Sequence, residues 1–236
     1  MQGHPEVALL LVVMFVCYFR PGEPLTIQSK DVAPPHGHFA YTALNVFPSE
    51  REGRNKTGLA DVSLLLNAPY VPYLSSLVAL LAQARSGRPL FGCRYLNVKN
   101  LFEAAQMALR LPERFVLYQV RHGGPSHDMA FGYRSMAEIK ARGQWVTDAS
   151  VKRYEGHARL QQVEAQLSGP QARLAAGAPR RLEALLQSKF LQICEAAEEL
   201  GAPSTVNGRA PWKSSPAAGI SRKRLRAKVS PASVGM

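Results

Sequence analysis

The chain has 236 residues, enough for one domain with a sizeable core, with or without a tail. Hydrophobic residues make up 46% and charged residues 19% of it, which excludes a largely disordered protein. Lys and Arg number 29 against 17 Asp and Glu, a formal net charge of +12. Such an excess attracts polyanions, so nucleic acid is the leading class of partner and an anionic membrane surface the second.

The apolar run at residues 7–19 (VALLLVVMFVCYF) is shorter than the ~20 residues needed to span a bilayer. A signal-peptide core is the alternative, but His4 and Glu6 precede the run in place of a basic region, and Arg20-Pro21 follows it in place of a small-residue cleavage site. We therefore expect a buried helix here and no membrane span.

Three alternating stretches predict strands, with loops between them. They are Leu25–Gln28, Phe39–Phe47 and Asp61–Leu66. The charged segment before Asp61 reads as a turn, which would place Lys56 on a hairpin connection. This region is therefore predicted to form a small antiparallel sheet.

Beyond residue 70 the apolar spacing becomes helical. It predicts helices over Pro72–Ser86 and Asn97–Leu111. Ser135 with Glu138 is a capping-box pattern that opens a short helix ending at Gly143. Asp148 can cap a further helix through Leu167. Gly123-Gly124-Pro125 interrupts the stretch before Ser135, although Pro125 would be tolerated where a helix begins.

The C-terminal part differs in character from residue 168 onwards. One more helix is predicted over Arg180–Leu200, followed by a loop-like stretch and the basic run SRKRLRAKVS at residues 221–230. That run is either a solvated tail or a nuclear-import or phosphate-contacting segment. The sequence thus predicts a mainly α-helical α+β domain over residues 1–167, and a helix with a basic, partly disordered tail over residues 168–236.

Cysteine and histidine spacing predicts no metal site. Cys17, Cys93 and Cys194 are odd in number, far apart and without a C-x-x-C pair, which favours a reducing compartment over a disulfide framework. His36 and His38 stand in a Pro/Gly-rich loop and are interpreted as turn residues rather than ligands.

One tyrosine has several polar companions in the sequence. Tyr154 follows Lys152 and Arg153 in the segment RGQWVTDASVKRYEGH, residues 142–157. A lone Tyr on a helix is usually a packing residue, so its role depends on the other groups. Four of these stand at predicted element edges: Arg20, Lys56, Arg121 and Trp145.

In this order and spacing, the residues resemble the catalytic domain of the tyrosine recombinases, the phage-integrase family. The shared pattern is Arg-x-x-Glu at residues 20–23, a hairpin Lys, Arg-His at residues 121–122, then Trp145 and Tyr154. The blocks YQVRHGGPSHD and RSMAEIKARGQW are similar to eukaryotic, transposon-derived members. The resemblance covers about residues 7–167.

The resemblance implies DNA strand cleavage and rejoining through a covalent 3′-phosphotyrosyl intermediate formed by Tyr154, without metal, ATP or another cofactor. Arg20 and Arg121 would clamp the scissile phosphate, because planar guanidinium groups match its oxygens. By the same resemblance Lys56 would protonate the leaving oxygen, unless it is a solvated turn lysine. Trp145 would donate its indole N–H to the phosphate.

Supporting roles and partners follow from the same resemblance. Glu23 would orient Arg20, while Lys152 and Arg153 would point away from the tyrosine and contact backbone phosphates. The expected partner is double-stranded DNA, bound by a homotetramer on paired sites, with the helix over Arg180–Leu200 docking on a neighbour. The expected location is the nucleus.

The sequence departs from the family in two places. Tyr118 stands three residues before Arg121, where the family usually has a His, and His122 would face away on a helix. The separate N-terminal helical domain that closes around DNA is expected to be lacking. The alternative is therefore an inactive, domesticated or truncated recombinase that only binds double-stranded DNA.

Overall fold

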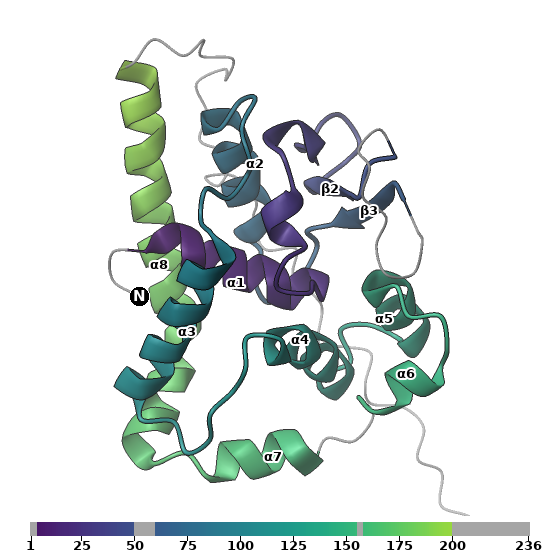
Figure 1. The fold of residues 1–236 in the computed structure, drawn as a ribbon, viewed down its shortest axis with the longest axis vertical. Coiled ribbons are helices and arrows are strands. Elements are labelled where there is room, and N and C mark those ends of the chain that lie inside the picture. The colour runs from purple at the N-terminus through teal and green to yellow at the C-terminus, as the bar shows by residue number, and fades with distance from the viewer. Residues whose placement is uncertain (1–3, 50–59, 155–157, 200–236) are drawn as a thin grey trace, which may run out of the picture. The chain divides into compact units, whose positions relative to one another are not determined.

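The computed structural model describes residues 4–49, 60–154 and 158–199 of the chain. It has a mainly helical α+β fold with one three-stranded antiparallel sheet in these residues. Figure 1 shows helix α1 in the middle of the described part, with helix α2 above it, helix α4 below it and the long helix α8 crossing it. The fold class predicted from the sequence is confirmed at this level.

The apolar run near the N-terminus forms the buried helix α1, Pro5–Cys17. It is apolar on every side, as a helix surrounded by protein should be. Within residues 4–49, 60–154 and 158–199, none of the helices combines the length and the apolar character that a membrane crossing requires. The helix ends where Tyr18 adopts a left-handed conformation (φ 57°) and the N–H of Phe19 bonds to the carbonyl of Met14 at 3.0 Å.

The sheet has the strand order β1-β2-β3, with β1 at Val32–Ala33, β2 at Ala43–Val46 and β3 at Val62–Leu65. Leu44 stands opposite Val32 on one side and Leu64 on the other. All three side chains are buried, so this face of the sheet packs on the core. The antiparallel pairing of β2 with β3 agrees with the predicted hairpin, although Lys56 lies outside the described residues.

The predicted strand at Leu25–Gln28 is wrong. The segment forms a short 3-10 turn, η1 (Pro24–Thr26), and a second turn, η2 (Ser29–Asp31), follows it. Pro24 fixes its own backbone angle, and the Thr26 hydroxyl donates to the carbonyl of Glu23 at 2.8 Å, so local bonds replace a strand at the start of the segment. At its end Gln28 forms an isolated antiparallel bridge with Pro89. The third strand of the sheet, β1, comes instead from the segment predicted as a loop.

Most predicted helices form close to their expected places. Helices α2 (Leu74–Ala84), α3 (Tyr95–Leu109) and α5 (Met136–Gly143) match the sequence pattern, and the capping box of Ser135 with Glu138 is present. The helix expected from Asp148 to Leu167 is described as two, α6 (Ala149–Lys152) and α7 (Ala158–Ala165). The carboxylate of Asp148 bonds to Lys140 at 2.6 Å and caps no helix.

Helix α4, Gln119–Ala130, corrects the expectation of a break at residues 123–125. It runs through both glycines and through Pro125, although Pro125 removes the N–H that would bond to the carbonyl of Arg121. A Cβ on Gly124 would lie 2.0 Å from the backbone oxygen of Phe15. The glycines therefore serve close packing of α4 on α1 instead of ending the helix.

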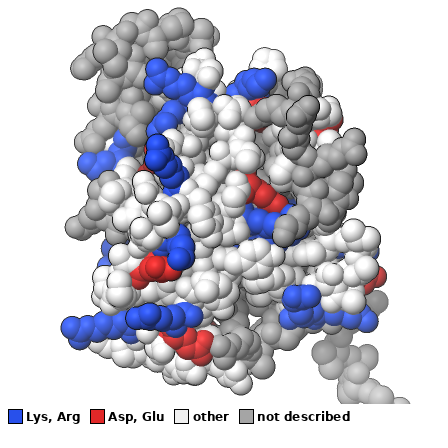
Figure 2. Space-filling view, viewed as in Figure 1, with Lys and Arg blue, Asp and Glu red and all other residues white. Residues whose placement is uncertain are grey.

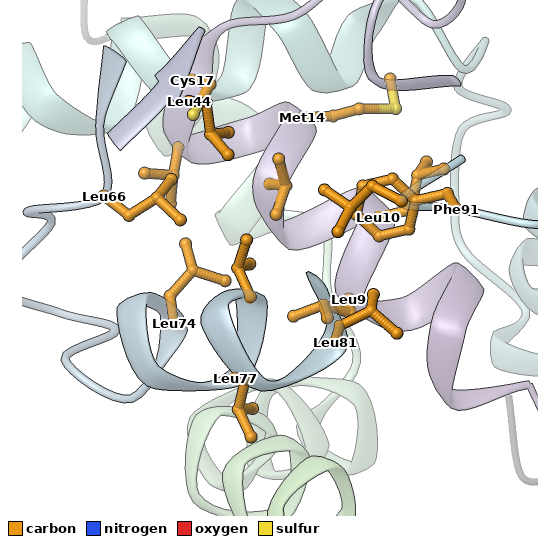
Figure 3. Packing of buried hydrophobic residues seen from close by; sticks show 14 of the residues in the cluster. Leu9, Leu10, Met14, Cys17, Leu44, Leu66, Leu74, Leu77, Leu81 and Phe91 are labelled. Atoms are coloured by element: carbon orange, nitrogen blue, oxygen red, sulfur yellow. The ribbon is translucent and has the colours of Figure 1, made fainter. Parts of the chain in front are cut away.

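The main core joins α1, α2, the sheet and the long helix α8, Gly169–Glu199. Figure 3 shows Leu9 of α1 next to Leu81 of α2 and Leu10 of α1 next to Phe91, with Leu77 pointing toward α8. Leu186 and Phe190 of α8 are buried in this same core. This face of α8 therefore packs within its own chain. Docking of the helix over Arg180–Leu200 on a neighbouring subunit stays a prediction. The domain boundary at residue 167 stays a prediction.

Candidate active site

A second, smaller apolar cluster lies beside the main core. Its buried members are Tyr18, Ile139, Val151 and Tyr154, and Trp145 packs against it from a half-buried position. They come from the end of α1, from α5 and from the segment after it. In Figure 1, α4 and α5 lie next to each other beside the end of α1, with α6 beside α5. Of the polar groups singled out in the sequence, Arg121 contacts Trp145, and Glu23 joins Arg20 to Arg121.

Arg20 is placed by the end of α1 and the turn that follows it. The backbone N–H of Arg20 donates to Glu23 Oε2 at 2.7 Å, and its Nη1 donates to Glu23 Oε1 at 2.6 Å. The N–H of Glu23 returns a bond to the carbonyl of Arg20 at 2.9 Å. The four-residue turn therefore fixes both charged groups, and Arg20 keeps 22% of its side chain exposed.

Arg121 of α4 is almost fully buried and links three elements. Its Nη1 donates to the carbonyl of Tyr18, and its Nη2 donates to the carbonyl of Gly143 at 2.8 Å. Nη1 also lies 3.6 Å from Glu23 Oε2. Burial lowers the pKa of Arg121, and the charge of Glu23 opposes that effect. One carboxylate thus stands between the two arginines predicted to form the phosphate clamp.

Trp145 lies between Arg121 and the tyrosines. The guanidinium carbon of Arg121 is 5.0 Å from the centre of the indole, within the range of a cation–π contact. The indole stacks on Tyr18 at 6.1 Å between ring centres and contacts Tyr154 at 5.3 Å. A Cβ on Gly143 would lie 2.0 Å from the indole ring, so this position needs glycine.

Tyr154 is 3% exposed, and its hydroxyl lies 2.6 Å from Nδ1 of His122. Burial raises the pKa of this phenol, while the charges of Arg153 and Arg121 lower it. The expectation that His122 faces away is wrong. Helix α4 lies against both α5 and the Tyr154 segment, so its consecutive residues 121 and 122 both reach the site. No pattern in the sequence distinguished this imidazole from a surface one.

The remaining predicted residues lie at the edge of the site or outside the described part. Tyr118 is exposed at the start of α4, with its ring 5.1 Å from that of His122. Lys152 and Arg153 are exposed. Arg153 acts electrostatically on both His122 and Tyr154. That Lys152 and Arg153 point away from the tyrosine and contact DNA phosphates stays a prediction. Lys56 falls in residues 50–59, which the structure does not describe.

Asp128, a buried carboxylate that the sequence analysis did not single out, holds Tyr18 in place. Asp128 Oδ2 accepts hydrogen bonds from the hydroxyl of Tyr18 and from Arg134 Nη1. Burial would raise the pKa of Asp128, but the neighbouring polar groups of His127, Tyr18 and Tyr70 and the charge of Arg134 outweigh it and hold the pKa at about 2. Asp128 thereby fixes Tyr18, whose carbonyl holds Arg121 and whose ring supports Trp145.

Arg142 of α5 is a further residue that the sequence did not single out. Its Nε donates to the carbonyl of Val16 at 2.7 Å, and its Nη2 donates to the carbonyl of Leu65 at 2.7 Å. Its guanidinium also lies over the ring of Tyr18 at 5.9 Å. Arg142 therefore joins α5 to the end of α1 and to the sheet, which positions Gly143 beside Arg121.

The surface around these elements carries both signs of charge. On the face shown in Figure 2 the Lys and Arg side chains stand in separate groups, several of them next to acidic side chains. Within the described ranges, His, Cys, Asp and Glu form no group of three that could hold a metal ion. The described part of the predicted site thus consists of arginine and lysine side chains, aromatic rings that include the phenols of Tyr118 and Tyr154, and the carboxylate of Glu23.

Comparison with known proteins gives no further identification. The chain matches no model of a protein family, and a search of curated proteins finds no significant match.

Proposed function

We propose that this protein cleaves and rejoins one strand of double-stranded DNA at a time, through a covalent 3′-phosphotyrosyl intermediate on Tyr154, as tyrosine recombinases do. The observation that carries the proposal is the gathering of Arg20, Arg121, Trp145 and Tyr154. These residues come from separate segments of the chain. Arg121, Trp145 and Tyr154 are in contact in that order, and Glu23 joins Arg20 to Arg121. A homotetramer on paired DNA sites and a nuclear location belong to the same proposal.

The two arginines suit the charge that develops on a phosphate under attack. A guanidinium has five N–H groups, and Arg121 uses two of them on backbone carbonyls, so others can donate to phosphate oxygens. Glu23 holds Arg20 in place at the partly exposed edge of the cluster. Each preorganised donor of this kind is commonly worth about 3 to 4 kcal/mol in the transition state.

The phenol of Tyr154 is the nucleophile in this proposal. Its oxygen attacks phosphorus, the bond from phosphorus to the 5′ oxygen breaks, and the 5′ oxygen takes a proton from Lys56. The phosphotyrosyl bond keeps the free energy of the broken linkage for rejoining. Because Tyr154 is 3% exposed, the proposal requires DNA binding to bring a phosphate to the hydroxyl.

A trapping experiment tests the proposal without knowledge of the target sequence. The protein is incubated with a pool of duplexes of randomised sequence, each nicked so that the short cleaved fragment diffuses away. We expect a covalent protein–DNA adduct that survives denaturing electrophoresis. Tyr154→Phe should abolish it, while Tyr95→Phe, at an exposed tyrosine of α3, should leave it unchanged. An equal yield from Tyr154→Phe would refute the assignment.

A second function, DNA binding without cleavage, is favoured by the bonds of the site itself. Arg121 is held by two backbone carbonyls and Tyr154 by an imidazole, and such contacts also stabilise a fold without catalysis. This alternative predicts duplex binding that weakens steeply with salt, and no adduct from any sequence in the pool.

A further inference from the structure

We propose that His122 is the general base that takes the proton of Tyr154, an inference that rests on the proposed strand cleavage. The contact that carries it is the 2.6 Å approach of the phenol oxygen to Nδ1 of His122. A base has to lie within about 2.6 to 3.2 Å of the proton-bearing atom, and this pair meets that condition. Position 118, where the family usually has His, holds a phenol instead.

The surroundings of His122 favour a neutral ring before the reaction. Burial lowers the pKa of His122, and so do the charges of Arg153 and Arg121. With its proton on Nε2, the ring accepts the O–H of Tyr154 at Nδ1. Burial meanwhile raises the pKa of Tyr154, so the phenol stays protonated near pH 7 and needs a base.

Bound DNA would favour transfer of the proton from Tyr154 to His122. The groups facing the His122–Tyr154 pair are Arg121, Arg153 and the ring of Tyr118. A phosphate beside Arg121 adds a negative charge that offsets the arginines, so the penalty on forming an imidazolium falls. Proton transfer is therefore favoured once the substrate is in place.

Each proton that moves in cleavage and rejoining has a donor and an acceptor among the groups named. The O–H proton of Tyr154 passes to Nδ1 of His122, and the phenolate oxygen forms the bond to phosphorus. The 5′ oxygen leaves with its electron pair and takes a proton from Lys56. On rejoining, the 5′ hydroxyl returns its proton to the neutral amine of Lys56 and attacks phosphorus. The bond from phosphorus to the Tyr154 oxygen breaks, and the imidazolium of His122 gives its proton to that oxygen.

Tyr118 has a packing role beside this pair. Its ring meets the imidazole edge-on, at 5.1 Å between centres and an angle of 68°, while 43% of the residue is exposed. A phenol is a poor base near neutral pH because its pKa is about 10. We therefore interpret Tyr118 as a packing neighbour of the imidazole and not as the base.

The experiment compares His122→Asn with wild type in the nicked-duplex adduct assay. Asparagine keeps an acceptor oxygen near the place of Nδ1 but cannot take up the proton. We expect adduct formation to slow by about 10²- to 10⁴-fold, with duplex binding and thermal unfolding close to wild type. His38→Asn, at an exposed loop residue, is the matched control and should keep the wild-type rate.

Two further measurements separate a base from a structural hydrogen bond. The wild-type rate should rise with pH until His122 has lost its proton and should then stay constant. This plateau should begin at a pH lower than about 6.5, the ordinary pKa of histidine, whereas in His122→Asn the rate should keep rising. A duplex with sulfur at the 5′ bridging position, whose leaving group needs no proton, should restore Lys56→Ala but not His122→Asn. Added imidazole should partly restore His122→Ala.

The outcomes distinguish this inference from the proposed function. If wild type forms no adduct from any sequence in the pool, the proposed function fails and the inference with it. If wild type forms the adduct and His122→Asn does so within a few-fold, with the same pH profile, strand cleavage stands and His122 is not the base. If His122→Asn does not fold, the wild-type pH profile tests whether His122 is the base. A wild-type rate that reaches no plateau before about pH 6.5 overturns the inference.

Discussion

The carbonyl oxygen of Gly143 accepts a 2.8 Å hydrogen bond from Nη2 of Arg121. Gly143 is the last residue of α5, and the final carbonyls of a helix lack partners within it. A cation at this end also complements the helix dipole. The same residue lets the indole of Trp145 approach the helix end, so one glycine determines the positions of Arg121 and Trp145 together.

Gly143→Ala should therefore displace Trp145. A Cβ here would lie 2.0 to 2.5 Å from three atoms of the indole, and such overpacking typically costs about 1 to 3 kcal/mol of folding free energy. Denaturant unfolding and tryptophan fluorescence measure the two effects. Gly169→Ala, where the added carbon would meet one arginine nitrogen at 3.6 Å, is the control. An unchanged fluorescence spectrum in Gly143→Ala would contradict this packing.

Asp128→Asn should alter how stability depends on pH. The pKa of Asp128 is about 2 in the folded chain and 3.8 for an ordinary Asp, so between these values the unfolded state binds more protons and stability rises with pH. The ionised carboxylate contributes about 2 kcal/mol above about pH 4, and this is lost as pH falls toward 2. Asn removes that dependence and leaves the charge of Arg134 with the neutral side chain of Asn67 and no carboxylate, a loss of about 3 to 5 kcal/mol of folding free energy.

Thermal unfolding followed from about pH 5 to about pH 2 measures this effect as a difference between variant and wild type. Asp148→Asn removes an exposed carboxylate that bonds to Lys140, so it serves as the matched control with a small expected effect. Equal acid dependence in Asp128→Asn and wild type would show that Asp128 is not ionised in the folded chain at these pH values.

Lys152→Ala and Arg153→Ala should each reduce the salt dependence of duplex binding. Both residues are exposed and adjoin Tyr154 in the chain. Each phosphate contact releases condensed counterions and makes the slope of log K against log salt more negative by about 0.9, so losing one contact should reduce the slope by that amount. Binding isotherms at several salt concentrations give this slope. Lys99→Ala, at an exposed lysine of α3 that pairs with Glu103, should leave it unchanged if DNA lies over the tyrosine.

Phe190→Ala should destabilise the whole described fold. Phe190 is 1% exposed and packs in the core that contains α1 and α2, and truncating a buried Phe typically costs about 3 to 5 kcal/mol. Chemical denaturation of the full chain measures the loss. Leu174→Ala in the same helix is the control, because that leucine is 41% exposed. An equal effect of both substitutions would contradict the packing of α8 in this core.

The elements that the sequence predicted well are those whose local pattern and tertiary environment agree. The apolar run of α1 has no polar face to expose, and the capping box at Ser135 satisfies its own backbone donors. The strand expected at Leu25–Gln28 failed because Pro24 and Thr26 form local bonds that compete with a ladder. The break expected in α4 failed because Gly124 serves contact with α1, which no local rule contains.

By itself the sequence determined the positive charge, the long apolar helix, the helical spacing after residue 70 and the order of Arg20, Arg121, Trp145 and Tyr154. Only the tertiary structure decided which groups meet: His122 at the phenol of Tyr154, and Asp128 behind Tyr18. The physical reason is that composition and periodicity are properties of neighbours along the chain. Hydrogen bonds between side chains depend instead on how closely α4 packs against α1 and α5, which the folded core sets.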